Sequence, residues 1–515
     1  MKPISILVLV LIVFVWAQQS RPQTANAKVP TNFVVVDGLT RVPGESPFSD
    51  CSIIPVSGEA NYLNAEVEPW IAVDPENRDH LIGVWQQDRW QFGGSRGLLT
   101  GVSRDGGETW TRTFAHFSHC AGGNAANGGD FERASDPWVT FSPNGTAYQI
   151  ALTFDAFDAN QAVLVSHSSD GGDTWSEPTT LIFDTDPNVG DDKESITADP
   201  RDSRFVYAVW DRADINVPPG KIPTWFARST NGGASWEPAH IIYDPGLGAG
   251  TLSNQIVVLP DGALVNLFDL FNSNGAFLAV ILSSDKGATW SQPIIVNTQD
   301  SIGIVDIKTG EPVRAGFIPN ITVNQKNGTL YVVWEDARFS GFSRDGIVFS
   351  KSTDGGLTWS PPAQVNQAPN VQAFTPSILI AKNGRLAITY YDFRKDTPDP
   401  GTLLTNYWQI TSDDGGNTWH EIPLSGAFDM RTAPVAIGGF FVGDYEGLTY
   451  AEKSFTPFFV LANSGNIVNR TDVFVISAEE GGDTSTNGHE ENNSHPHSLR
   501  ERALSYRERR PSPMR

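Results

Sequence analysis

Short runs in which apolar and polar residues alternate follow one another through most of the chain. One unit of this pattern contains runs over 195–198, 205–210 and 224–228, then a turn at 231–233. Period-two runs bounded by Gly, Pro, Asn and Asp are typical of antiparallel strands that are joined by hairpins. Each unit therefore predicts a four-stranded antiparallel meander.

The spacing of these meanders predicts a β-propeller, because a meander of this length matches one propeller blade. A last set of runs, 447–450, 457–461 and 472–476, lacks a fourth strand, and residues 32–36 could supply it. Closing the ring in this way removes the exposed edges of an open sheet. Seven blades are preferred and six are the alternative. The first six predicted innermost strands lie at 69–73, 137–141, 195–197, 255–258, 320–323 and 376–380.

A turn motif with the pattern S-x-D-x-G-x-T-W recurs in the chain. Its Asp can accept hydrogen bonds from the backbone of its own turn, Gly supplies positive φ, and Trp can pack between blades. The motif resembles the Asp-box of the sialidase and BNR-repeat superfamily, where it joins the third and fourth strands of a blade and is structural. The resemblance implies that the chemistry lies elsewhere. The copies end at Trp110, Trp175, Trp236, Trp290, Trp359 and Trp419.

The two ends of the chain differ from this repeated part. Residues 1–27 combine Lys2, an apolar run and a final Ala25-Asn26-Ala27, which is the order of a secretory signal peptide. We therefore expect residues 28–477 to form the propeller of a secreted, extracellular or periplasmic protein. Residues 478–515 have almost no aliphatic side chains and are expected to be disordered.

If the protein is exported, its two cysteines can form a disulfide, and its net charge indicates which partners it can bind. Cys51 and Cys120 are expected to form a disulfide in an oxidising compartment, with two free thiols as the alternative. The net charge of −23 argues against a nucleic-acid partner. No later segment is long and apolar enough to span a bilayer. We expect a monomer with a glycan partner.

The candidate functional residues lie where the second strands of the meanders end and the first strands begin. The predicted topology places these strand ends on one face of the propeller. Aromatic-Asp and aromatic-x-Asp-x-Arg patterns recur there, and Arg212 and Arg338 have an alternative role in salt bridges between blades. Other residues on this face are not required by the repeat. They include Arg133, Asp136, Asp192, Glu194, Asp444 and Tyr445.

Similarity to sialidases implies roles for these residues, in an exo-α-sialidase that acts on terminal anionic sugars. An arginine cluster would bind the sugar carboxylate, Asp136 would be the acid, and Tyr445 would be the nucleophile, activated by Glu194 or Asp444. The arginine candidates are Arg89, Arg133, Arg338 and Arg394, and the further substrate contacts are Asp192, Tyr391 and Asp392.

Two other functions stay open. One is a non-catalytic extracellular propeller that binds a glycan, a protein or a cation such as Ca²⁺ on its acidic face. The other is a glycosidase that uses the carboxyl pair Asp136 and Glu194. The Phe/Tyr-Arg-Ile-Pro signature of sialidases is absent, and Thr40-Arg41-Val42-Pro43 is the nearest string. No organic cofactor is expected, because the sequence has no P-loop, dinucleotide or zinc motif.

Overall fold

The computed structural model describes residues 38–42, 44–315, 318–451 and 454–476. Within them the protein is all-β, and the helical segments described are three short 3₁₀ turns, η3 (His119–Ala121), η4 (Arg338–Ser340) and η5 (Met430–Thr432). The predicted signal peptide, the predicted strand at 32–36 and the predicted tail at 478–515 lie outside the described residues.

Most strands form antiparallel meanders of four strands, as the alternating pattern predicts. The first two meanders are joined into one sheet by a single pairing of Ser95 with Ala134. The six meanders are β2 (Glu66–Val73), β3 (Leu81–Arg89), β4 (Ser95–Ser103) and β5 (Thr111–Thr113); β6 (Arg133–Phe141), β7 (Ala147–Phe154), β8 (Gln161–Ser168) and β9 (Thr179–Asp184); β10 (Val189–Ala198), β11 (Val206–Asp214), β12 (Thr224–Ser229) and β13 (His240–Tyr243); β14 (Gly250–Val258), β15 (Leu264–Asn272), β16 (Gly275–Ser283) and β17 (Ile294–Thr298); β20 (Asn320–Val323), β21 (Leu330–Asp336), β22 (Gly346–Ser352) and β23 (Ala363–Gln364); and β24 (Ala373–Ile380), β25 (Leu386–Asp392), β26 (Leu404–Ser412) and β27 (His420–Pro423), with β28 (Phe428–Asp429) also paired to β26.

The two ends of the described chain share one further four-stranded sheet. Its order is β1 (Leu39–Arg41), β33 (Thr471–Ile476), β32 (Ser454–Ala462) and β31 (Gly447–Ala451), and Leu39 pairs with Ile476. An N-terminal strand therefore completes the last sheet, as expected, and residues 39–41 form it; the segment 32–36 that the sequence suggested lies outside the described residues.

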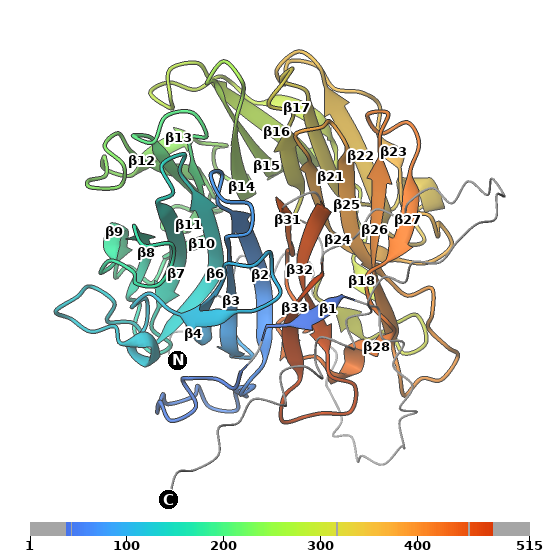
Figure 1. Ribbon diagram of the computed structural model, residues 1–515, viewed down its shortest axis with the longest axis horizontal. Coiled ribbons are helices and arrows are strands. Elements are labelled where there is room, and N and C mark those ends of the chain that lie inside the picture. The colour runs from blue at the N-terminus through green and yellow to red at the C-terminus, as the bar shows by residue number, and fades with distance from the viewer. Residues whose placement is uncertain (1–37, 43, 316–317, 452–453, 477–515) are drawn as a thin grey trace, which may run out of the picture. The chain divides into compact units, whose positions relative to one another are not determined.

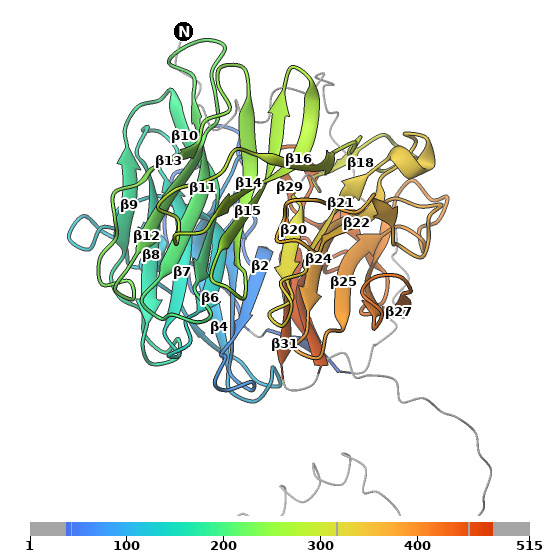
Figure 2. The same cartoon turned by 90° about the horizontal axis from the view of Figure 1, so that it is seen from above.

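The first strands of the sheets contact one another in chain order, from β2 through β6, β10, β14, β20 and β24 to β31, and β31 contacts β2 again. Figure 1 shows β2 and β31 near the middle, with the fourth strands β9 and β27 toward the edges. The view from above shows the same succession from β9 to β27 (Figure 2). Buried apolar side chains fill the space between neighbouring sheets; Tyr207 and Phe226, for example, pack with Ile256. The starts of all first strands are thus brought to one end of a common axis.

The repeated turn lies between the third and fourth strands and is held by its own side chains. In one copy, Ser352 Oγ and Thr358 N donate to Asp354 Oδ1 at 2.8 and 2.9 Å, and Trp359 Nε1 donates to Gly356 O at 3.2 Å. The indole of Trp290, from another copy, packs on Phe226 of the preceding meander with a centroid separation of 5.6 Å. These contacts are local or between sheets, which supports a structural role for the motif.

The charge of this turn should contribute to stability in a pH-dependent way. Hydrogen bonds from Thr358 and Ser352 lower the pKa of Asp354 to about 2 from 3.8. The stabilisation is therefore complete above the unfolded pKa and is lost as the pH falls through about 2. We expect Asp354→Asn to lower the melting temperature at pH 7 and to have a smaller effect at pH 2, measured by thermal unfolding at both values. An equal effect at both pH values would contradict an electrostatic contribution.

A small sheet that the sequence did not predict is built from two long connections. It has the order β18 (Ile304–Val305), β19 (Pro312–Val313), β30 (Gly439–Phe440) and β29 (Val435–Ala436), and Val313 pairs in parallel with Phe440. Arg314 N donates to Phe440 O at 2.9 Å directly beyond this pairing. The small sheet therefore fixes the backbone of Arg314, which reaches the candidate site.

The predicted disulfide is present. Cys51 and Cys120 are bonded with a Cα–Cα distance of 5.5 Å. It joins the segment before β2 to η3, which lies between the first two meanders.

Candidate functional site

The first strands β2, β6 and β10 each begin with a β-bulge that carries charged side chains. Register breaks in β2, β6 and β10 accompany left-handed φ values of 53° at Glu68, 51° at Asp136 and 50° at Lys193. None of these residues is glycine, so the conformation is held by its surroundings. Bulges of this kind re-aim side chains. Here they turn two acids and one amine toward one another.

Lys193 is the centre of the resulting ionic cluster. Its Nζ lies 2.5 Å from Asp136 Oδ1, 2.8 Å from Asp444 Oδ2 and 3.3 Å from Glu68 Oε1. Burial alone would lower the pKa of Lys193, but the carboxylates of Asp136, Asp444 and Glu68 raise it well above its ordinary value. The amine therefore stays charged and holds side chains from β2, from β6 and from the connection that precedes β31. We call Glu68, Asp136, Asp192, Lys193 and Asp444 the Lys193 cluster.

Two arginines border this cluster and flank one aromatic ring. The guanidinium of Arg314 pairs with Asp444 through Nε and Nη2 at 3.0 and 2.5 Å. It also lies 4.7 Å from the ring centroid of Phe441, and the guanidinium of Arg89 lies 4.9 Å from the same centroid. Arg89 Nη1 donates to Gln86 Oε1 at 2.5 Å. Arg89 was expected at the site, whereas Arg314 was not.

The acids of the cluster have pKa values shifted in opposite directions. Burial raises the pKa of Asp192 to about 6 and that of Glu68 to about 7. Burial also acts on Asp444, but Arg314 and Lys193 outweigh it and hold the pKa of Asp444 well below its ordinary value. Asp192 and Asp444 are partly exposed, whereas Glu68 is buried. The site thus presents one carboxyl that can hold a proton and one that stays ionised.

Glu194 lies next to Lys193 in the chain and is buried. It is 2% exposed, and both carboxyl oxygens lack a hydrogen-bond partner within the described residues. Burial, with the negative charge of Asp136, raises its pKa well above its ordinary value. This shift disfavours the anionic form that Glu194 would need to activate Tyr445.

Tyr445 has an environment opposite to that of an activated nucleophile. Its hydroxyl donates to Pro137 O at 3.1 Å, and its ring packs edge-on against Trp138 at 5.3 Å. Burial and the nearby carboxylates, Glu68 first among them, raise its pKa well above 10. The expectation that neighbouring acids draw off the phenolic proton is wrong, because those acids disfavour a second negative charge.

Three of the expected arginines do not belong to the Lys193 cluster. Each is already bound by one or two carboxylates of the protein. Arg133 pairs with Glu59, Arg338 with Asp336, and Arg394 with Asp392 and Glu421. The side chains of Arg212 and Arg338 also reach Asp184 and Asp300, which follow or end the preceding meander. The salt-bridge alternative is thus the arrangement that the structure contains.

Tyr391 and Asp392 also make contacts that stabilise the fold. Tyr391 is fully buried and donates to Glu446 Oε1 at 2.9 Å and Val460 O at 2.7 Å. Asp392 accepts a bond from Trp408 Nε1 at 2.9 Å in addition to its pairing with Arg394. The sequence placed them on the rim, but the structure turns them into the protein interior.

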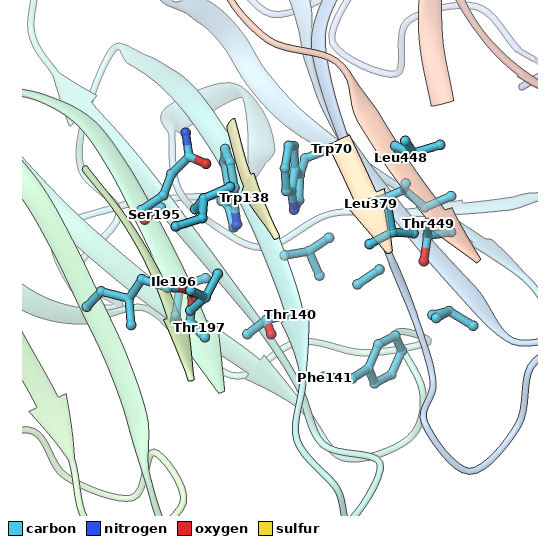
Figure 3. A pocket seen from close by; sticks show the side chains of 18 of the residues that line it. Trp70, Trp138, Thr140, Phe141, Ser195, Ile196, Thr197, Leu379, Leu448 and Thr449 are labelled. Carbon is cyan, nitrogen blue, oxygen red and sulfur yellow. The ribbon is translucent and has the colours of Figure 1, made fainter. Parts of the chain in front are cut away.

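A cavity lies further along the same first strands. Its volume is about 310 Å³, and it is lined by the segments that follow the bulges, including Ile71, Ile196 and Thr140. Trp70 and Trp138 stack with a centroid distance of 3.4 Å and stand beside one another in Figure 3. They line this cavity, and Tyr445 lies against both rings on the side of the Lys193 cluster. The Lys193 cluster and this cavity are therefore separate.

The described part of the chain contains no group of three or more His, Cys, Asp or Glu arranged to hold a metal ion. Among the same residues, no helix is both long and apolar enough to cross a membrane. Lys193 itself supplies the positive charge at the centre of the carboxylates.

Comparison with solved structures finds distant likenesses. A Hadza microbial sialidase is 15% identical, covers 78% of this chain and 75% of its own, and has a TM-score of 0.45. The alpha-L-arabinanase of Penicillium chrysogenum, complexed with arabinobiose, is 13% identical over 85% of this chain and 98% of its own, with a TM-score of 0.43. A mutant of NanB sialidase from Streptococcus pneumoniae is 12% identical over 81% and 68%, with a TM-score of 0.40. At these values the three structures say nothing about the substrate or the catalytic residues of this chain.

Sequence comparison gives a more specific result. No curated protein matches the chain. Residues 220–437 match the BNR repeat-like domain, a segment that runs from the third meander to the small sheet. Over these residues, the match confirms the likeness to BNR-repeat proteins that the repeated turns predict.

Proposed function

We propose that this protein is a glycoside hydrolase that removes terminal sugars from glycans with two carboxyl groups, Asp192 and Asp444. The observation that carries the proposal is that these two partly exposed acids belong to one ionic cluster and have pKa values displaced in opposite directions. Carboxyl groups with separated pKa values are the usual acid and base of glycoside hydrolysis. The BNR match supports the same class of reaction.

The geometry suggests a role for each side chain. Asp192, whose pKa is about 6, would donate its proton to the oxygen of the leaving group. Asp444, kept ionised by Arg314 and Lys193, would act on the anomeric carbon, directly or through a water molecule. Lys193 and Arg314 are positioning residues, because they hold Asp444 by hydrogen-bonded ion pairs.

An exo-α-sialidase is the narrower form of this proposal, and the repeated turns and the BNR match support it at the level of the superfamily. The side chains do not support the tyrosine mechanism, because Tyr445 donates to Pro137 O and lies in a setting that disfavours phenolate. The carboxyl pair Asp136 and Glu194, which the sequence suggested, is also less suitable, since both are buried.

A non-catalytic binding protein is the second candidate. The observation that favours it is that Lys193 is already bound by three carboxylates, an arrangement that also suits a permanent ionic network. Such a protein would bind a glycan, a protein or a cation on the same face without hydrolysis.

We further infer a seven-bladed closed propeller, supported by the contact of β31 with β2 and by the N-terminal strand in the last sheet. We propose that the protein is secreted, either extracellular or periplasmic, and works as a monomer. The disulfide between Cys51 and Cys120 supports an oxidising compartment.

Tyr445→Phe separates the two hydrolytic mechanisms. If Asp192 and Asp444 carry the reaction, we expect this variant to keep its turnover within about threefold, since only one hydrogen bond to Pro137 O is lost. The measurement is steady-state hydrolysis of a panel of aryl glycosides that includes sialosides and arabinosides. A loss of about 100-fold or more in a folded variant would assign the nucleophile to Tyr445. No hydrolysis of any glycoside by the wild-type protein would favour the binding protein.

A further inference from the structure

Both partners of the ion pair between Arg314 and Asp444 come from the small sheet. Arg314 directly follows β19, and Asp444 comes shortly after β30. The two strands are joined by the pairing of Val313 with Phe440 and by Arg314 N, which donates to Phe440 O at 2.9 Å. The contact of β19 with β30 therefore sets how far the backbone of Arg314 lies from that of Asp444.

The segment after β30 also contacts the start of β2. The ring of Phe441 is buried with Val67 of that strand. One residue further along each segment, Glu68 N donates to Val442 O at 3.1 Å. The backbone that carries Asp444 is thus bonded to the bulge that carries Glu68, so a shift of the small sheet would reach both acids of the Lys193 cluster.

Arg431, in η5, holds the turn that joins β18 to β19. Its Nη2 lies 2.9 Å from Asp306 Oδ2, 3.0 Å from Thr309 Oγ1 and 2.5 Å from Glu311 Oε2. Asp306 is fully buried, and the Arg431 guanidinium lies 5.6 Å from the ring centroid of Phe440. One side chain therefore contacts both the β18–β19 turn and strand β30.

Glycine is required where β30 meets β19. Gly439 has a φ of 130°, and a Cβ on it would lie 2.1 Å from Pro312 O. Because the obstructing atom belongs to the backbone, it cannot move aside as the end of a flexible side chain can. Any larger residue at this position would push β19 away from β30.

We propose, on the basis of the hydrolase function above, that the small sheet positions the Lys193 cluster for the reaction and that Arg431 is the residue that holds the small sheet in place. Two parallel hydrogen bonds between a guanidinium and a carboxylate need a fixed geometry. The small sheet supplies it for Arg314 and Asp444. Arg431 acts through Arg314 and is a positioning residue.

Arg431→Gln tests this role, because glutamine is shorter and cannot form the ion pair with Asp306. We expect kcat on an aryl glycoside to fall about 10- to 100-fold, the scale of displacing a catalytic group by about 1 Å. Burial opposes the lowered pKa of Asp444, which Arg314 and Lys193 maintain, so a loosely held Arg314 raises that pKa. The acid limb of kcat should therefore move to higher pH.

Gly439→Ala tests the same element without removing a charge and should change kcat and the acid limb in the same directions. Its control is Gly384→Ala, at a φ of 99° where no atom lies within 4 Å of an added Cβ. The control for Arg431→Gln is Arg228→Gln, which removes an arginine whose Nε lies 2.8 Å from Glu237 Oε2. Neither control should move the acid limb or lower kcat.

Hydrogen–deuterium exchange follows the small sheet without any substrate. In both variants we expect the amides of Arg314 and Phe441, which bond across the small sheet and to Pro434 O, to exchange at least about tenfold faster. The effect should extend to the amide of Glu68, which is bonded to Val442 O. Exchange in β14 should stay unchanged.

The outcomes separate this proposal from the hydrolase function. Faster exchange in the small sheet with a wild-type kcat, or a lower kcat with an unmoved acid limb and a lowered melting temperature, would reduce its role to stability and overturn the proposal. Unchanged exchange in both variants would also overturn it. If the wild-type protein hydrolyses no glycoside, the hydrolase function fails, and exchange at Glu68 decides alone: a faster rate supports positioning of the cluster, and an unchanged rate excludes it.

Discussion

Replacing Asp192 with Asn is expected to lower turnover by at least about 100-fold, which is the scale of losing a general acid. Asn cannot release a proton to the leaving group, and Asp192 is the partly exposed acid of the cluster whose pKa, about 6, keeps it partly protonated near neutrality. The measurement is kcat on an aryl glycoside across pH.

The dependence of kcat on pH tests the role of Asp192 as the acid. Because the protonated form of Asp192 is required, wild-type kcat should fall as the pH rises through about 6. The acid limb should lie below the ordinary range of aspartate, because Asp444 must be ionised and its pKa is lowered by Arg314 and Lys193. Asp202→Asn, in a turn after β10, is the control and should keep the wild-type profile. Full activity of Asp192→Asn with an unchanged alkaline limb would exclude Asp192 as the acid.

Replacing Arg133 with Met is expected to destabilise the protein by about 3 to 5 kcal/mol, because it leaves a buried carboxylate without its partner. Arg133 Nη1 and Nη2 donate to the two oxygens of Glu59 at 2.8 and 2.7 Å, and the side chains are 2% and 0% exposed. The guanidinium also packs on Trp90 at 4.8 Å. Urea unfolding measures the loss.

A double variant isolates the buried charge as the cause. Glu59→Gln combined with Arg133→Met removes both charges and should recover part of the stability that Arg133→Met alone loses. KM for the substrate should stay unchanged in whatever fraction folds, because Arg133 lies outside the Lys193 cluster. A raised KM at unchanged stability would instead return Arg133 to the set of substrate-binding arginines.

The scaffold could be predicted because its signals are local. The turn around Asp354 needs only hydrogen bonds from Ser352 and Thr358, so its sequence pattern specifies its geometry wherever it occurs. Period-two runs predicted the meanders in the same way, and the register follows from which face is buried. The sequence predicted that an N-terminal strand completes the last sheet, but not that Leu39–Arg41 forms it. Which short segment takes this place depends on how all the sheets pack together.

The site was predicted only in part. Asp136, Asp192, Asp444 and Arg89 lie at the cluster, as their positions at the ends of strands suggested. Arg314 was missed because it comes from a long connection whose small sheet forms only when β19 meets β30, far away in sequence. Its signal was the length of that connection between β17 and β20.

By itself, the sequence determined the repeated turns, the four-stranded meanders and the end of the fold at which charged residues gather, since these follow from backbone preferences within a few residues. Tertiary structure alone decided which charges pair. Arg133 pairs with Glu59, and Lys193 pairs with Asp136, Asp444 and Glu68. The hydroxyl of Tyr445 donates a hydrogen bond to Pro137 O. The partners in these interactions are far apart in the sequence. The sign of each pKa shift depends on burial and on the nearest charges in space, and neither is defined until the sheets have packed around their axis.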